Sequence, residues 1–165
     1  MFRIQDTKNF YMKKILLIMI TVSLSLTSCL KSGLDDIENS SLCEISSITM
    51  EYRWIEQNAN GYDQMSRQQM ILSNSTPDEN NEIRFVVTVP AASSTFPAEI
   101  RNSVQLDGLY LISVISSAAK ITPLGNSPTL GLPGAFVIGK DYEYEVTAAN
   151  GESCIYHIII EDFVK

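Results

Sequence analysis

Apolar and polar residues alternate along most of the chain after residue 42, with the period of two that half-buried β-strands show. The alternation predicts strands over residues 43–54, 65–72, 83–89, 106–116, 142–148 and 154–161. Residues 97–103 predict one helical turn, and no window has the pattern of a three-turn amphipathic helix. Several short strands separated by turn signals, such as Asn60-Gly61, predict an all-β sandwich.

Three segments depart from simple alternation. The apolar phase flips at Ser46-Ser47, which predicts a β-bulge or an edge strand that passes between two sheets. The mostly apolar run from Leu106 to Ser116 predicts a strand covered on both faces. The segment from Thr122 to Gly139 contains three prolines and four glycines, which predict an irregular connection along a sheet edge.

The last two predicted strands form a hairpin whose register follows from its turn. A two-residue Asn150-Gly151 loop would pair glutamates with apolar residues, since Glu145 would face Tyr156. A three-residue loop with Gly151 in a left-handed conformation instead pairs Tyr144 with Tyr156. Because a shift of one residue reverses every side chain, we predict the three-residue loop, which gives one continuous apolar face.

The N-terminal region has the pattern of a secretory signal. Met12-Lys13-Lys14 is followed by the apolar run Ile15–Leu26, whose 12 residues are fewer than the roughly 20 that a membrane-spanning helix needs. Since Met12 starts a better signal than Met1, translation from Met12 is the expected start. We predict a signal peptide over residues 1–28.

The signal ends at Leu26-Thr27-Ser28-Cys29, which resembles the lipobox of bacterial lipoprotein precursors. The resemblance implies that Cys29 carries a diacylglycerol thioether and that its freed amine receives a fatty acyl chain such as palmitate. Residues 29–41 are polar and acidic and predict a flexible tether, followed by a domain over residues 42–165. Asp35 and Asp36 also resemble an export signal of some surface lipoproteins, so we expect an outer-membrane lipoprotein exposed on the cell surface, with a periplasm-facing location as the alternative.

Removal of residues 1–28 changes the net charge from −7 to −10, because that segment holds four basic residues and one acidic residue. An acidic surface repels phosphate backbones, so we expect no nucleic-acid partner. The membrane contact is expected from the lipid alone.

Cys43 and Cys154 remain after Cys29 is assigned to lipid attachment. In an oxidising compartment they are a possible disulfide pair. The alternative is that both are small buried apolar residues.

The second half of the chain resembles a known family. The segments SSAAKITPLGNSPTLGLPGAF and YEYEVTAANGESCIYHIII, together with EYRW at Glu51–Trp54, are similar to the DUF5018-type lipoproteins of gut-dwelling Gram-negative bacteria. The resemblance covers roughly residues 48–162 and implies an immunoglobulin-like β-sandwich of about 7–8 strands with no catalytic motif to transfer.

We find no catalytic constellation in the sequence and predict a protein that is not an enzyme, without metal or cofactor. His157 is the single histidine; it is expected opposite Glu143 on a strand, with no partners at ligand spacing. A Ser-His nucleophile motif, GxGxxG and a P-loop are absent from the sequence. Asp78, Glu79 and Glu82 offer oxygen ligands for calcium, but their order favours a solvated loop.

Three aromatic residues are candidates for ligand contact: Trp54, Tyr62 and Tyr110. Trp54 shares the phase of the core residues, whereas Tyr62 follows a turn glycine and is the best exposed candidate. We therefore predict a lipid-anchored, non-catalytic envelope module for binding or scaffolding, serving glycan capture or assembly of an uptake complex with another envelope protein. The alternative is a structural or adhesive surface subunit that acts by protein–protein contacts.

Overall fold

The computed structural model describes residues 40–165, so the predicted signal peptide, Cys29 and the tether up to residue 39 lie outside the described residues. The described part contains nine strands and one short helix. Their bounds are β1 (Ile45–Gln57), β2 (Asp63–Gln69), β3 (Ile71–Leu72), β4 (Glu82–Thr88), α2 (Ala98–Ser103), β5 (Asp107–Ile115), β6 (Lys120–Pro123), β7 (Pro133–Ala135), β8 (Asp141–Thr147) and β9 (Ser153–Val164). The helix among these residues is not long and apolar enough to cross a membrane.

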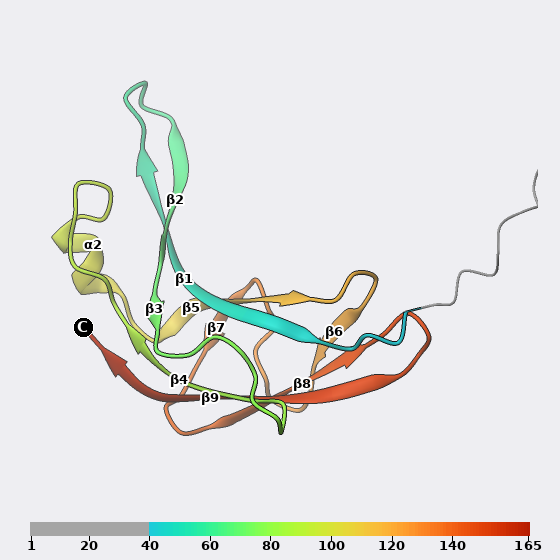
Figure 1. The fold of residues 1–165 in the computed structure, drawn as a ribbon. Helices are drawn as coiled ribbons and strands as arrows, with labels where there is room; N and C mark the ends of the chain where they lie inside the picture. Colours follow the sequence, from blue (N-terminus) through green and yellow to red (C-terminus); the bar gives the residue numbers. More distant parts are fainter. Residues whose placement is uncertain (1–39) are drawn as a thin grey trace, which may run out of the picture. The chain divides into compact units, whose positions relative to one another are not determined.

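The strands form two sheets, which confirms the predicted all-β sandwich (Figure 1). Sheet A has the order β2-β1-β5-β7, and sheet B has the order β3-β4-β9-β8-β6. The strand total of nine exceeds the expected 7–8 because β3 and β7 are only two and three residues long. Such short edge strands leave almost no periodic signal in a sequence.

The inward-facing residues of both sheets share one hydrophobic core. In β4 the apolar residues Ile83, Phe85 and Val87 are fully buried, and the residues between them face outward, as the alternation predicts. From sheet A, Ile48 and Met50 enter the same cluster.

The C-terminal hairpin has the predicted register. Val146 pairs with Cys154, Tyr144 with Tyr156, and Glu143 with His157. The turn is the predicted three-residue loop, since the Ala148 N–H donates to the Glu152 carbonyl at 2.8 Å. Gly151 has φ +93°, the left-handed conformation that this loop requires.

The hydroxyl groups of the core tyrosines hold the irregular segments in place. Tyr144 donates to the Pro128 carbonyl at 2.8 Å, and Tyr156 donates to the Cys43 carbonyl at 3.1 Å. The Tyr142 hydroxyl accepts the Val137 N–H at 2.7 Å. The bonds of Tyr142 and Tyr144 fix the proline-rich connection, which has few strand contacts of its own, and the bond of Tyr156 fixes the segment before β1.

Cys43 and Cys154 are joined by a disulfide, with their Cα atoms 5.7 Å apart. The bond links the segment before β1 in sheet A to β9 in sheet B. It therefore ties the start of the described domain to its last hairpin, across 111 residues of sequence.

The predicted bulge at Ser46-Ser47 is confirmed, because the pairing of β1 with β5 shifts between Ile45 and Ser47. The single strand predicted over residues 65–72 is wrong. The chain leaves sheet A after Gln69 and enters sheet B at Ile71, so Met70 separates two strands. Met70 is 2% exposed, which gives the crossing a buried side chain at its centre.

The prediction that the segment 106–116 is covered on both faces is also wrong. β5 buries Leu109 and Leu111, but Val114 on its outer side is 54% exposed. The segment 122–139 follows the edges as predicted, and it supplies β6 at the end of sheet B and β7 at the end of sheet A.

Candidate functional site

The β1–β2 hairpin extends beyond the sandwich (Figure 1). β1 pairs with β5 only up to Glu51, whereas its remaining residues pair only with β2. The turn contains Gly61 with φ +79°, and the Asn58 N–H donates to the Tyr62 carbonyl at 2.9 Å. The outer part of the hairpin is therefore a two-stranded ribbon.

The three aromatic candidates occupy different environments. Trp54 is 8% exposed and packs against Phe96, with ring centroids 5.8 Å apart. Tyr110 lies under the guanidinium of Arg53, whose Cζ is 4.2 Å from the ring centroid. Tyr62 is 71% exposed at the hairpin end. The structure therefore leaves Tyr62 free for stacking and uses the other two in packing.

The hairpin also exposes two aliphatic side chains that the sequence analysis missed. Ile55 and Met65 are directly opposite each other on β1 and β2, and they are 69% and 66% exposed. We call these two side chains the hairpin patch; Tyr62 is exposed near the turn of the same hairpin but has the opposite phase in the alternation. The sequence did contain a signal for this exposed pair. Ile55 has the opposite phase to the core residue Trp54, and Met65 is opposite Ile55 across the Asn-Gly turn.

A charged cluster holds the base of the hairpin. Glu51, only 6% exposed, accepts hydrogen bonds from the guanidinium of Arg53. Arg67 lies 3.8 Å from the same carboxylate, and its own side chain is 75% exposed. Glu51 is opposite Tyr110 on β5, so the cluster connects β2, β1 and β5 on the outer face of sheet A.

A second carboxylate, that of Glu56, holds side chains together on the other face of the ribbon. Glu56 accepts hydrogen bonds from Ser66, from Gln64 at 3.1 Å and from the Trp54 indole at 3.2 Å. These bonds, the one from Ser66 foremost, lower the pKa of the Glu56 carboxyl. Both faces of the hairpin are thus held by side chains other than the hairpin patch.

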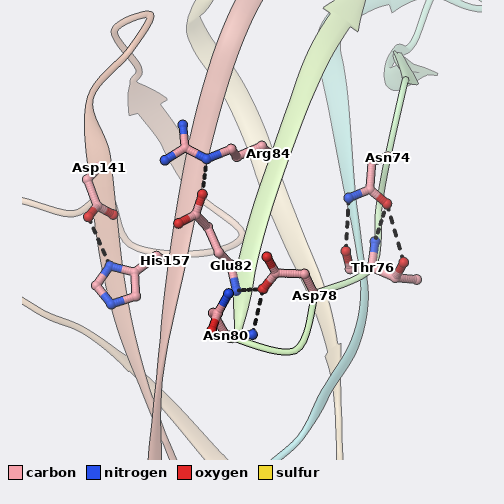
Figure 2. Close-up of polar contacts among 8 residues, drawn as sticks. All are labelled: Asn74, Thr76, Asp78, Asn80, Glu82, Arg84, Asp141 and His157. Carbon is pink, nitrogen blue, oxygen red and sulfur yellow. Dashed lines mark hydrogen bonds and ion pairs between the residues drawn. The ribbon is translucent and has the colours of Figure 1, made fainter.

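His157 lies opposite Glu143, as predicted, but its hydrogen bond is to another residue (Figure 2). Its Nδ1 is 2.9 Å from Asp141 Oδ2. Asp141, Glu143 and His157 present ligand atoms that all lie within 4.8 Å of one another, and these side chains could hold a metal ion. The inference that His157 lacks partners at ligand spacing was therefore wrong. Asp141 is diagonal to His157 across the two strands, and side-chain rotamers, which the sequence does not reveal, bring the two together.

The acidic loop before β4 uses its polar side chains to build turns. Asp78 Oδ1 accepts the N–H groups of Asn80 and Glu82 at 2.8 and 2.9 Å, and Glu82 pairs with Arg84 (Figure 2). Asn74 makes a similar turn with Thr76 at 3.2 Å. These contacts agree with the solvated-loop interpretation rather than a calcium loop.

Two of the shallow hollows on the described surface have linings relevant to a site. The larger, about 490 Å³, lies where the chain crosses from β2 to β3 and is lined by Thr49, Gln68, Gln69, Met70 and neighbouring residues, with no ionisable side chain. The smaller, about 270 Å³, lies beside Asp141 and Glu143. The lining of the smaller hollow also includes Lys140 and Ser127, and the Ser127 hydroxyl oxygen accepts the Glu143 N–H at 2.9 Å.

Among curated proteins, none matches this sequence significantly. The chain is similar to a crystal structure from Bacteroides fragilis described as a "putative secreted protein", with 26% sequence identity and a TM-score of 0.67. The similarity covers 76% of this chain and 98% of the Bacteroides chain. The family model described as DUF5018-related matches residues 45–159, which extend from the first residue of β1 into β9. The protein belongs to the DUF5018-related family.

Proposed function

We propose that this protein is an exported, lipid-anchored and non-catalytic module of the cell envelope that binds a protein partner through the hairpin patch. The observation that carries the proposal is the exposure of Ile55 and Met65, directly opposite each other on a hairpin that extends beyond the sandwich. Large apolar side chains gathered on a soluble surface mark interaction sites, and aromatic residues and methionine are enriched there.

The hairpin patch is not needed to hold the hairpin together. The inner face packs through Trp54 and Phe96, and the base is held by Glu51 and Arg53. An exposed isoleucine and methionine therefore contribute little to folding, which supports a role in contact with a partner. Because the ribbon is already held on both faces, binding would cost little additional ordering of the backbone.

The partner contact can be tested by placing a photo-crosslinking amino acid at position 55 or 65 in the full chain within intact cells. We expect one discrete adduct from both positions. Ile155, which is 47% exposed on β9 in sheet B, is the matched control position and is expected to give none. Equal adducts from position 155, or none from 55 and 65, would contradict the proposal.

The envelope location is supported by the signal pattern that ends at Cys29 and by the description of the Bacteroides relative as secreted. Lipid anchoring at the outer membrane predicts that Cys29→Ala moves the protein from the membrane fraction to the soluble fraction. Fractionation of cells that express the variant and the parent measures this, and a variant that stays with the membrane refutes the anchor. Protease accessibility on intact cells distinguishes surface exposure from a periplasm-facing location.

Glycan capture is the second candidate, and a single observation favours it: the 71% exposure of Tyr62. A flat aromatic ring can stack on the apolar face of a sugar. On this hypothesis Tyr62→Ala abolishes retention by host-derived polysaccharides, whereas Tyr62→Phe preserves it. Affinity electrophoresis with immobilised glycans measures the difference, and equal retention of both variants excludes the Tyr62 site.

A further inference from the structure

The two sheets have four edge strands, and three of them are poorly suited to pairing. β3 has two residues, β7 has three and begins at Pro133, and β6 has four and ends at Pro123. Short edges and proline are common protections against edge-to-edge association. The fourth edge, β2, has seven residues and no proline.

The hydrogen bonds of the hairpin identify the backbone groups on the free edge of β2. Tyr62 and Met70 bond to β1, through Asn58 N–H to Tyr62 O and Met70 N–H to Met50 O. The backbone N–H and C=O groups of successive residues in an antiparallel strand point alternately to its two sides. The backbone groups of residues 64, 66 and 68 therefore also point towards β1. The N–H and C=O groups of Asp63, Met65, Arg67 and Gln69 therefore point away from the sheet.

The side chains on this edge are self-complementary. Asp63 and Arg67 are opposite charges placed symmetrically about Met65, on the same face of β2. Charges of one sign would repel a second copy, as in many protected edges. In an antiparallel pair centred on Met65, each Asp63 instead faces the Arg67 of the other copy, and the two Met65 side chains face each other.

We propose that β2 pairs antiparallel with β2 of a second copy of this chain, in the register that places Met65 opposite Met65. The two four-stranded sheets A then become one continuous eight-stranded sheet. Arg67 is available for this contact. Its side chain is 75% exposed, and its distance of 3.8 Å from the Glu51 carboxylate is long for an ion pair. This inference goes beyond the proposed function, and it would place two copies of the hairpin patch side by side.

A register centred on Ser66 is the main competitor, and it would place Asp63 opposite Gln69 and Met65 opposite Arg67. That arrangement leaves Asp63 without an opposite charge directly across from it. Opposite-charge cross-strand pairs stabilise a sheet and like-charge pairs destabilise it. The charges therefore favour the register centred on Met65.

Charge reversal tests both the pairing and its register in the purified full chain in detergent micelles, with sedimentation velocity as the measurement. The parent is expected to be a dimer that dissociates on dilution. Asp63→Arg, which leaves the contact between Arg67 and Glu51 intact, is expected to weaken the dimer at least about tenfold. Arg67→Asp is expected to act in the same direction, and the double reversal D63R/R67D is expected to restore the dimer to within about threefold of the parent.

Circular dichroism of each variant shows whether the sandwich is intact. If D63R/R67D fails to fold, oxidation of Met65→Cys provides a second test, since it should yield a covalent dimer that the parent and Val114→Cys do not. A monomeric parent at all concentrations overturns the proposal. A dimer that is indifferent to the reversals also overturns it, and so does a Met65→Cys variant that gives no more covalent dimer than the parent.

Discussion

At the scale of residues, the structure places charge and hydroxyl groups where a β-sandwich usually has apolar side chains. Glu51 is the one buried acidic side chain in residues 40–165, and the phenols of Tyr142 and Tyr144 are fully buried. Each has hydrogen-bond partners, and no buried side-chain nitrogen or oxygen in the described part of the chain lacks one. Their contributions can be measured one by one.

Glu51→Ala is expected to destabilise the domain by about 1–2 kcal/mol, because Arg53 loses its carboxylate partner in a partly buried site. Arg67→Ala is the matched control and is expected to cost no more than about 0.5 kcal/mol, since this guanidinium is exposed and more distant. Urea unfolding at pH 7 measures both. Equal losses for the two variants would contradict the prediction that the contact of Glu51 with Arg53 outweighs its contact with Arg67.

Tyr144 predicts a pH dependence. Burial, and secondarily the neighbouring Tyr142, raises the pKa of the Tyr144 phenol above that of the unfolded chain. The folded state therefore keeps a proton that the unfolded state releases. Its contribution is complete below about pH 10 and is lost as the pH rises further.

We expect Tyr144→Phe to flatten the fall in unfolding free energy as the pH rises above about 10, relative to the parent. At neutral pH the variant should lose about 1 kcal/mol, because the hydrogen bond to the Pro128 carbonyl is absent. Urea titrations at several pH values test both effects. Parallel pH profiles for parent and variant would refute the assignment.

At the scale of elements, turn geometry determines which face of each strand is buried. The three-residue loop of the β8–β9 hairpin places Tyr142, Tyr144 and Val146 on the core side, opposite the inward face of β9. The β1–β2 hairpin has its own turn, and that turn sets Ile55 opposite Met65 on the exposed side. One turn thus completes the core, whereas the other displays apolar side chains.

Gly151→Ala is expected to destabilise the domain by about 1 kcal/mol, because a Cβ is unfavourable at φ +93°. Ala149→Ser, at an exposed position of the same loop, is the control and should lie within about 0.5 kcal/mol of the parent. Thermal or urea unfolding compares the two. A neutral Gly151→Ala variant would show that the left-handed position is not required for this register.

At the scale of the whole molecule, the disulfide connects the two ends of the described domain. Because Cys43 and Cys154 are 111 residues apart, their bond restricts a long loop of the unfolded chain. The irregular segment between β5 and β8 contributes only short edge strands. The covalent link between the segment before β1 and the β8–β9 hairpin therefore compensates for a connection that makes few backbone hydrogen bonds with neighbouring strands.

Replacing both Cys43 and Cys154 by alanine is expected to lower the free energy of unfolding by about 2–5 kcal/mol. Alkylation under non-reducing conditions followed by mass spectrometry tests the bond itself, and neither cysteine should be modified in the parent. Alkylation of both in the folded parent would contradict the pairing. Reduction of the parent should reproduce the instability of the double variant.

The sequence by itself determined the all-β class, the bulge in β1 and the register of the C-terminal hairpin. These features depend on local alternation and turn chemistry, which neighbouring residues encode directly. The irregular edge connection was predictable for the same reason, since proline and glycine act locally.

Only the tertiary structure decided the features that depend on which segments become neighbours. Sheet order decides three of these features: whether β5 is covered on both faces, where the chain divides into β2 and β3, and which strands lie at the edges. The contact of Asp141 with His157 and the stacking of Arg53 over the Tyr110 ring require particular rotamers on adjacent strands. A period of two records which face a residue takes, but it carries no information about what lies against that face.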